Sequence, residues 1–381
     1  MAWNDIIGQH RVKNVLQKAI KENRIANSYC FSGIEGIGKE AVAIEFAKTV
    51  NCLSPVNQEG ERSACGVCDS CKQFRFLQHP NLTFIYSLPA GKSSDSKSDS
   101  SFSKLSEEQI EEIQAQFKLK AKDYYHKIAI ANASQIKIAS IRELKKSLSL
   151  SQMQAGRRVI IVLRADELSK ESANSFLKTL EEPNKDVTII LITARQDQIL
   201  PTILSRCQQI IFQPLSQDEL EQLLINKQSV GKTDAKLFAC FAQGSYQAAL
   251  EFLNEDIKKL RKDAVDLLRT ALRKRVYRYE LASRIDDILA SKDKKKYIAV
   301  LLHLLVWLRD ASTVSLTGNI NFIVNIDQKE DIQSFAKNFG SKNLIQAIEL
   351  IEKSISQVNK NVQNQLIFLN LFLKLRKILL F

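Results

Sequence analysis

The feature that most constrains the fold is a glycine-rich turn, CFSGIEGIGKE at residues 30–40, between an apolar strand and a helix. Its glycines and lysine have the spacing of a loop whose backbone N–H groups close around a phosphate: Gly33, Gly36, Gly38 and Lys39. The position after the lysine normally carries a Ser or Thr that holds Mg²⁺, whereas Glu40 stands there. Because its carboxylate would repel phosphates, we expect a degenerate nucleotide site.

Segments rich in Ile and Val alternate with amphipathic segments through the first half of the chain. The predicted strands are residues 28–32, 82–86, 128–131, 159–163 and 188–193. The predicted helices are residues 9–23, 39–51, 106–122, 138–148 and 170–180. This order is typical of an α/β domain with a parallel sheet covered on both faces. Ligands of such sheets bind at the carboxyl ends of the strands, where the glycine turn lies.

Four of the seven cysteines follow metal-ligand spacing: Cys52, Cys65, Cys68 and Cys71. Paired C-x-x-C steps let thiolates converge on one ion, and a fourth cysteine upstream completes a tetrahedral site without an open position. We therefore expect a structural Zn²⁺, with free reduced thiols as the alternative. The other three, at positions 30, 207 and 240, are expected to be buried apolar thiols.

Composition places limits on location. No stretch approaches the roughly 18 consecutive apolar residues of a membrane span, and residues 1–10 lack the pattern of a signal peptide. We expect a cytoplasmic protein. Residues from about 89 to 105 are serine-rich and polar, so they cannot form a core and are expected to be a disordered surface insertion.

Beyond Pro214 the pattern becomes helical, starting with a capping box at Ser216 and Glu219. The formal charge of the chain is +13, and residues 258–296 hold 14 Lys or Arg against 6 Asp or Glu, a net of +8. This basic segment could contact DNA through the phosphate backbone. A solvated helix surface is an equally good interpretation, because few aromatic residues lie among the charges.

Several motifs together resemble the AAA+ clamp-loader subunits of bacterial DNA polymerase III. They are FSGIEGIGKE, the cysteine cluster, ANSFLKTLEEP at 173–183, LPTILSRC at 200–207, WNDIIGQ at 3–9 and SQIKIASIREL at 134–144. The resemblance implies an AAA+ P-loop domain with an inserted zinc module (1–212, with the module at 52–71). It also implies a helical lid (213–254) and an α-helical oligomerisation collar (255–381).

The residues of ATP hydrolysis depart from the family pattern. Hydrolysing relatives end a strand with an Asp-Glu pair, and an ungapped match puts Leu163 and Arg164 there. A shifted strand end would instead supply Asp166 and Glu167. In the lid, Gln247 stands where active relatives carry a sensor arginine. We expect no useful ATP hydrolysis, and ATP binding itself is doubtful.

Arg206, in the SRC motif, is retained. In the family this arginine reaches into a neighbour's nucleotide site as a finger, although an ordinary surface ion pair would also explain an arginine here. The resemblance thus implies a non-hydrolysing stator in a complex with subunits resembling gamma/tau and delta, a sliding clamp and primed DNA. One alternative is an active gamma/tau-like ATPase. Another is an independent DNA-binding protein that uses the zinc module and the basic helices.

Overall fold

The computed structural model describes residues 2–58, 61–89, 105–149, 155–181, 186–253, 257–360 and 362–381, together with Phe102. The chain forms two compact units. The first comprises residues 1–220 and 243–247, and the second residues 221–242 and 248–381. The predicted boundaries of a separate lid and collar stay predictions, and each unit is described below by itself.

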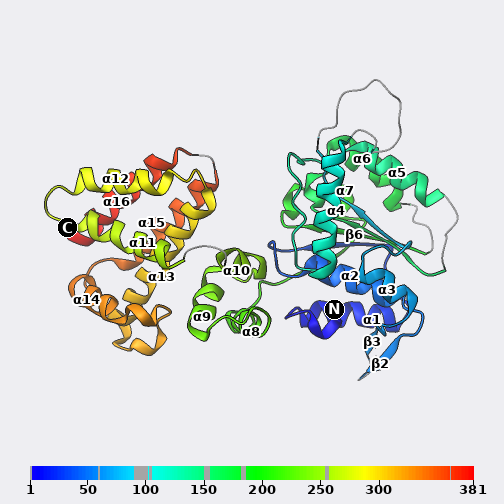
Figure 1. Ribbon diagram of the computed structural model, residues 1–381, viewed down its shortest axis with the longest axis horizontal. Helices are drawn as coiled ribbons and strands as arrows, with labels where there is room; N and C mark the ends of the chain where they lie inside the picture. The colour runs from blue at the N-terminus through cyan, green and yellow to red at the C-terminus, as the bar shows by residue number, and fades with distance from the viewer. Residues whose placement is uncertain are drawn as a thin grey trace. The chain divides into compact units, whose positions relative to one another are not determined.

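The first unit is built on a five-stranded parallel sheet in the order β4-β5-β6-β1-β7 (Figure 1). The strands are β1 (Ser28–Ser32), β4 (Leu82–Ile85), β5 (Arg158–Val162), β6 (Val187–Thr193) and β7 (Gln208–Ile211). The helices are α1 (His10–Lys21), α2 (Lys39–Val50), α3 (Asp69–Arg75), α4 (Glu107–Lys122), α5 (Ile138–Ser149), α6 (Lys170–Glu181) and α7 (Pro201–Leu204). The α/β class with a parallel sheet is confirmed, and β7 is a strand that the sequence pattern did not reveal.

The two faces of the sheet pack against different helices, because side chains alternate along a strand. In β1, Cys30 belongs to the core that includes Ile141 of α5 and Phe176 of α6. The neighbouring Tyr29 points the other way, where its ring meets Phe46 of α2 edge to face. The sheet is therefore covered on both faces, and β1, an inner strand between β6 and β7, leads directly into the glycine turn.

One predicted strand is wrong. Residues 128–131 form no ladder; Ile128 and Ile130 are buried, but the segment runs along α4. The backbone N–H of Ala129 donates to Gln116 Oε1 at 3.4 Å, and that of Ala131 donates to Glu112 Oε1 at 3.1 Å. Two side chains of α4 thus accept the backbone hydrogen bonds that a neighbouring strand would otherwise accept. The alternation of apolar residues fits this arrangement as well as it fits a strand, because both bury every second residue.

Two further segments lie near the cysteines and before α4: a hairpin that was not predicted and the predicted serine-rich insertion. A hairpin of β2 (Val56–Gln58) and β3 (Glu61–Ser63) lies between the first and second cysteines and was not expected. The serine-rich insertion falls largely outside the described residues. The helix after it begins as predicted, since Ser106 and Gln109 form a reciprocal capping box on α4.

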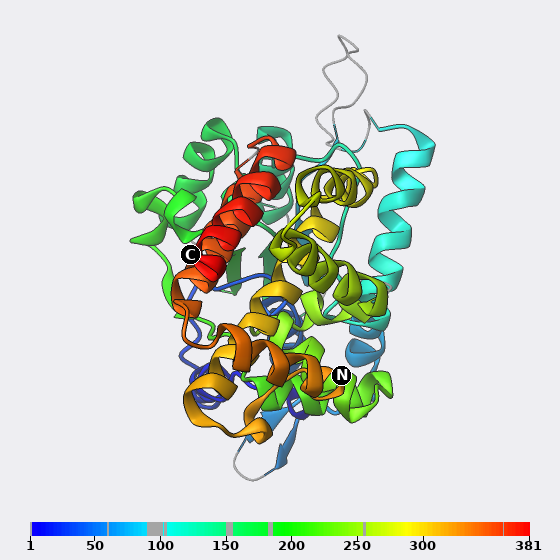
Figure 2. The ribbon, with the colours of Figure 1, turned by 90° about the vertical axis from the view of Figure 1, so that its left-hand side faces the viewer.

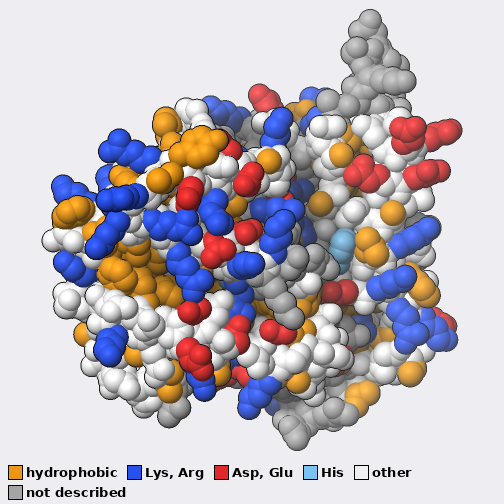
Figure 3. All heavy atoms as spheres, turned by 60° about the vertical axis from the view of Figure 1, so that its left-hand side comes forward, with side chains coloured by type: hydrophobic (Ala, Val, Ile, Leu, Met, Phe, Trp, Pro, Cys, Tyr) orange, Lys and Arg blue, Asp and Glu red, His pale blue; other side chains and the backbone are white. Residues whose placement is uncertain are grey.

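The second unit is helical. Helices α8 (Gln217–Gln228) and α10 (Tyr246–Leu253) cross from one unit to the other, and α9 is Lys232–Phe241. The rest of the unit comprises α11 (Ile257–Leu272), α12 (Tyr277–Leu289), α13 (Lys294–Thr317), α14 (Lys329–Phe339), α15 (Leu344–Asn359) and α16 (Asn364–Leu380). Helix α16, red in Figure 2, packs against α11, α12 and α15. Lys and Arg side chains gather on the face of this unit that Figure 3 shows.

The central helix of this unit is α13, which packs against α11, α14 and α15. Among the described residues it is the one helix long and apolar enough to cross a membrane. Because 72% of its apolar window is buried, α13 has the character of the core helix of a bundle.

Candidate functional site

The glycine turn joins β1 to α2, and all three of its glycines adopt positive φ angles. The ammonium group of Lys39 is folded onto the turn, where it donates to the carbonyl oxygens of Gly33 at 2.6 Å and Ile34 at 2.5 Å. Burial lowers the pKa of Lys39 to about 8. The structure thus brings the predicted loop residues together, with the lysine turned toward the loop's own backbone.

Glu40 is bound to a lysine that the sequence analysis did not single out. Its carboxylate forms an ion pair with Lys120 of α4. The Lys120 side chain is 1% exposed, and its ammonium also donates to the carbonyl oxygen of His126 at 2.7 Å. The negative charge expected to repel phosphate is therefore compensated by a buried cation.

The segment that resembles the lid sensor lies directly on the turn. The backbone N–H of Tyr246 donates to the carbonyl oxygen of Gly36 at 3.1 Å. A Cβ added at Gly36 would lie 2.4 Å from Ser245 Oγ and 2.6 Å from Gln247 Cβ. The neutral amide that stands in the sensor position is thus packed against the loop backbone.

The cavity beside the turn is narrow. Tyr125 packs on Gly38, and its hydroxyl accepts a hydrogen bond from the backbone N–H of Ile7 at 3.1 Å. The remaining free space is about 60 Å³, against roughly 300 Å³ or more for typical ligand pockets. Lys120 and Tyr125 are among the lining residues. This geometry leaves little room for a nucleotide.

At the end of β5, the two positions that the ungapped match aligns with the Asp-Glu pair, Leu163 and Arg164, carry no carboxylate. Leu163 is buried, and Arg164 has a left-handed backbone and pairs with Glu167 at 3.4 Å. Asp166 does line the loop cavity. Its Oδ1 accepts from Thr193 Oγ1 at 2.7 Å, and its Oδ2 accepts from Arg195 Nη2 at 2.6 Å. Both carboxylate oxygens of Asp166, the residue that a shifted strand end would supply, therefore already accept hydrogen bonds.

Arg206 follows α7 and is not among the residues that line the loop cavity. Its Nη2 donates to Glu181 Oε1 at 2.6 Å, and its Nη1 donates to the carbonyl oxygen of Thr202 at 2.8 Å. About 35% of its side chain is exposed. The guanidinium is thus held at the surface by one carboxylate and one carbonyl.

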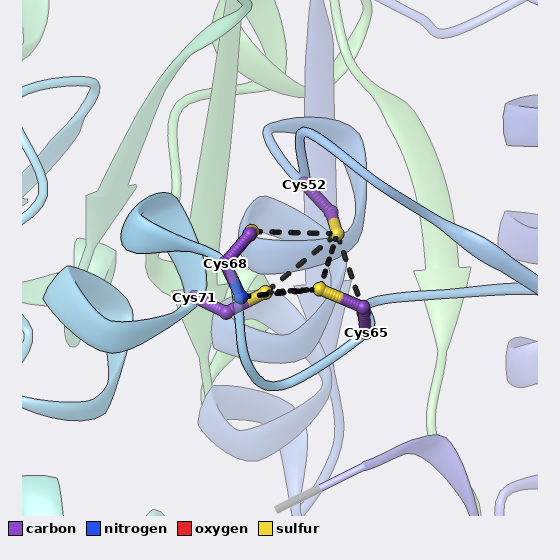
Figure 4. A group of neighbouring side chains, drawn as sticks. All are labelled: Cys52, Cys65, Cys68 and Cys71. Atoms are coloured by element: carbon purple, nitrogen blue, oxygen red, sulfur yellow. Dashed lines mark hydrogen bonds between the residues drawn. The ribbon is translucent and has the colours of Figure 1, made fainter.

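The four predicted cysteine ligands converge (Figure 4). The sulfur of Cys52 lies 3.6 Å from those of Cys65 and Cys71 and 3.9 Å from that of Cys68. A tetrahedral Zn²⁺ with Zn–S bonds of about 2.3 Å requires S···S separations of about 3.8 Å. Backbone N–H groups of Val67 and Cys68 lower the pKa of Cys65 to about 6, whereas burial raises the pKa of Cys52 and Cys71. The donor set fits a closed metal site.

Comparisons with known proteins agree along the whole chain. The model of the family "DNA polymerase III, delta subunit" matches residues 8–135 and 125–216, and its C-terminal model matches residues 248–377. The chain belongs to the DNA polymerase III delta subunit family. It is 25% identical over 370 residues to the delta' subunit of Bacillus subtilis, covering 97% of this chain and 96% of that relative.

This family member is also similar to tau and gamma subunits, over a shorter part of them. It is 26% identical over 258 residues to the tau/gamma subunit of Haemophilus influenzae, covering 66% of this chain and 30% of that relative. For the tau subunit of Bacillus subtilis the identity is 27% over 266 residues, with coverages of 67% and 38%. The likeness to this delta' subunit extends over nearly the whole of both chains, whereas the likenesses to these two tau or tau/gamma subunits cover about two thirds of this chain.

Sequence reasoning did not find three residues that shape the loop in this clamp-loader family member: Lys120, Tyr125 and Arg195. Lys120 lies in the segment predicted only as a helix at residues 106–122, and Tyr125 follows that helix without any motif. Arg195 lies 29 residues from the carboxylate that it binds. Each acts through tertiary contacts, so no local pattern marks it.

Proposed function

We propose that this chain is the non-hydrolysing stator, or delta prime, subunit of a replicative clamp loader. In this role it helps an ATP-driven complex to place a sliding clamp on primed DNA. The observation that carries the proposal is the pairing of Glu40 with Lys120 beside the loop lysine. Glu40 stands in the place of the residue that holds Mg²⁺, and its ion pair with Lys120 occupies its carboxylate and puts a competing cation beside the site.

Two further features support the absence of turnover. The hydrophobic Leu163 can neither bind magnesium nor polarise water, and Asp166 is engaged by Arg195 and Thr193. Loss of the metal hydroxyl, the strand-end carboxylates and the sensor arginine removes several kcal/mol or more of transition-state stabilisation. The narrow cavity argues against ATP binding as well.

Arg206 is proposed to act in trans on a neighbouring ATPase subunit resembling gamma or tau. A planar guanidinium at the surface can exchange one carboxylate partner for the γ-phosphate of a neighbour. The other proposed partners are a delta-like subunit, the clamp and the phosphate backbone of primed DNA within the complex. We place the protein in the cytoplasm and assign residues 213–254 and 255–381 as the lid and the collar.

The four cysteines are proposed to hold a structural Zn²⁺. Which metal they bind is tested by elemental analysis of the purified chain. Since four protein ligands close the coordination sphere, the ion would stabilise the fold of the first unit and take no part in hydrolysis.

The first test is Mg²⁺-dependent ATP hydrolysis by the purified chain, with Lys39→Ala as the control for contaminating ATPases. We expect both proteins to be inactive. If the wild-type chain hydrolyses ATP and the variant does not, the chain is an active gamma/tau-like subunit and the stator proposal fails.

The second test uses the reconstituted complex. Arg206→Ala should lower the rate of ATP hydrolysis at the neighbouring site that the finger serves by roughly 10³-fold or more. The complex should still assemble. Glu181→Gln is the matched control, because it breaks the same ion pair and keeps the guanidinium. Equal losses in both variants would mean that the pair is structural and that Arg206 is not a finger.

A further inference from the structure

The loop between α11 and α12 and the first three residues of α12, together residues 273–279 with the sequence RKRVYRY, are here named the basic turn. Its four cations are exposed: Arg273, Lys274, Arg275 and Arg278. The neighbouring carboxylate of Glu280 pairs with Arg273. Within the part of the chain that the structure describes, Lys274 and Arg275 form no ion pair, so their charges are left for a partner.

The last helix completes this surface. Arg376 Nη1 donates to the carbonyl oxygens of Ala271 at 2.6 Å and Arg273 at 2.7 Å. Its guanidinium also lies 4.0 Å from the centroid of the Tyr277 ring. These contacts hold the turn in place and cover the face of Tyr277 with a cation. The basic turn with Arg376 thus carries five cations against one carboxylate.

The two tyrosines of the basic turn are in different environments. Whereas Tyr277 lies under Arg376, the side chain of Tyr279 is 80% exposed. The adjacent Val276 is 69% exposed and has a left-handed backbone (φ 58°), a costly conformation for a β-branched residue. An exposed aromatic ring therefore lies in the same short segment as the exposed cations, directly after Arg278.

We propose that the basic turn and Arg376 bind single-stranded nucleic acid, with Tyr279 stacking on a base and the cations contacting phosphates. Single-strand binding surfaces combine these two elements, because an unpaired base exposes a π-face and its backbone carries regular negative charge. Duplex DNA keeps its bases stacked inside, and an acidic peptide would use only the cations. The proposal goes beyond the stator function, since it depends on neither the loop nor the finger.

The experiment measures binding of the full chain to labelled oligothymidine by fluorescence anisotropy, at low ionic strength and then through a salt titration. Tyr279→Ala should weaken binding by roughly 5- to 100-fold. Phe322→Ala is its control, because Phe322 is an aromatic residue of the same unit that is 68% exposed. Tyr279→Ala should leave binding of a duplex of equal length unchanged.

The cations are tested by their effect on the salt dependence. Lys274→Ala with Arg275→Ala should lower the slope of log affinity against log salt by about 1.4, the value for two phosphates of a single strand. Lys337→Ala with Lys353→Ala removes two exposed charges elsewhere on the unit and should leave the slope unchanged. Circular dichroism checks that each variant is folded.

Three outcomes would overturn the proposal. The first is wild-type protein that does not bind oligothymidine at low ionic strength. The second is Tyr279→Ala that binds as wild type does while the double lysine-arginine variant weakens, which would mean an electrostatic patch without stacking. The third is an equal loss in Phe322→Ala, which would mean that no particular aromatic residue is used.

Discussion

The ion pair between Glu40 and Lys120 should be coupled strongly enough to measure. Removing one partner of a buried pair leaves an uncompensated charge and typically costs 3–5 kcal/mol. Lys120→Met leaves the carboxylate of Glu40, which is 25% exposed, so we expect a cost near the lower bound, about 3 kcal/mol. Glu40→Gln leaves the buried ammonium of Lys120 without its carboxylate, with a hydrogen bond to the carbonyl oxygen of His126. We expect this variant to lower the free energy of unfolding by about 4 kcal/mol.

The double variant Lys120→Met with Glu40→Gln leaves no charge unpaired. Its cost should be lower than the sum of the single costs by about 2 kcal/mol, within the range of roughly 0.5–3 kcal/mol seen for residues in direct contact. A control of the same chemistry is Lys72→Met, which breaks the exposed pair with Asp69 on α3. That variant should unfold as wild type does, since exposed ion pairs contribute little.

Urea unfolding followed by tryptophan fluorescence is a suitable assay, because each unit holds one of the two tryptophans. In a Trp307→Phe background, Trp3 reports on the first unit alone. Its side chain is 2% exposed and donates to Thr49 Oγ1 at 2.9 Å, so unfolding exposes a buried indole. Single costs below 1 kcal/mol, or costs that add within 0.5 kcal/mol, would refute the coupling.

Two other predictions concern the metal site and a buried histidine. Cys68→Ser should remove bound metal and lower the melting temperature of the first unit by roughly 5 to 10 °C; unchanged melting by Trp3 fluorescence would contradict this. Burial lowers the pKa of His303 to about 3, whereas unfolded histidine titrates near 6.5. The unfolded state therefore binds the extra proton, and this group lowers the stability of the second unit by about 2.3 kcal/mol as pH drops from 6.5 to 4.5. His303→Phe should lack this loss, as judged by urea unfolding at each pH against wild type.

Local patterns predicted the elements that local chemistry determines. Strand β1 was predicted at its observed bounds, and the capping boxes at Ser106 and Ser216 begin α4 and α8. The cysteine centre was equally predictable, because the short C-x-x-C steps place thiols close together whatever the rest of the fold does. The strand expected at 128–131 was wrong, since alternation records burial and does not reveal whether a strand or a helix side chain accepts the backbone hydrogen bonds.

The departure of the loop from a magnesium-binding sequence was predicted, but the ion pair that compensates its carboxylate was not. From its position alone, Glu40 could be recognised as replacing the Ser or Thr that holds Mg²⁺ and as repelling phosphate. Its partner Lys120 lies 80 residues away on a helix with the polar pattern of an exposed one. Likewise, nothing in the sequence links Asp166 to Arg195 and Thr193. Charge compensation of this kind depends on how helices and strands pack, and a linear pattern does not encode it.

The glycines of the turn have a reason to be present that is independent of phosphate. A methyl group at Gly33 would come within 2.7 Å of the backbone oxygen of Phe212, and one at Gly36 would collide with Ser245 and Gln247. Substitution would therefore push apart neighbouring segments of the same unit even if no nucleotide ever bound. A glycine-rich signature can outlast the chemistry for which it is named, because it also serves as a tight joint between chain segments. In proteins of this architecture, the residues that surround the signature are better indicators of ATP turnover than the signature itself.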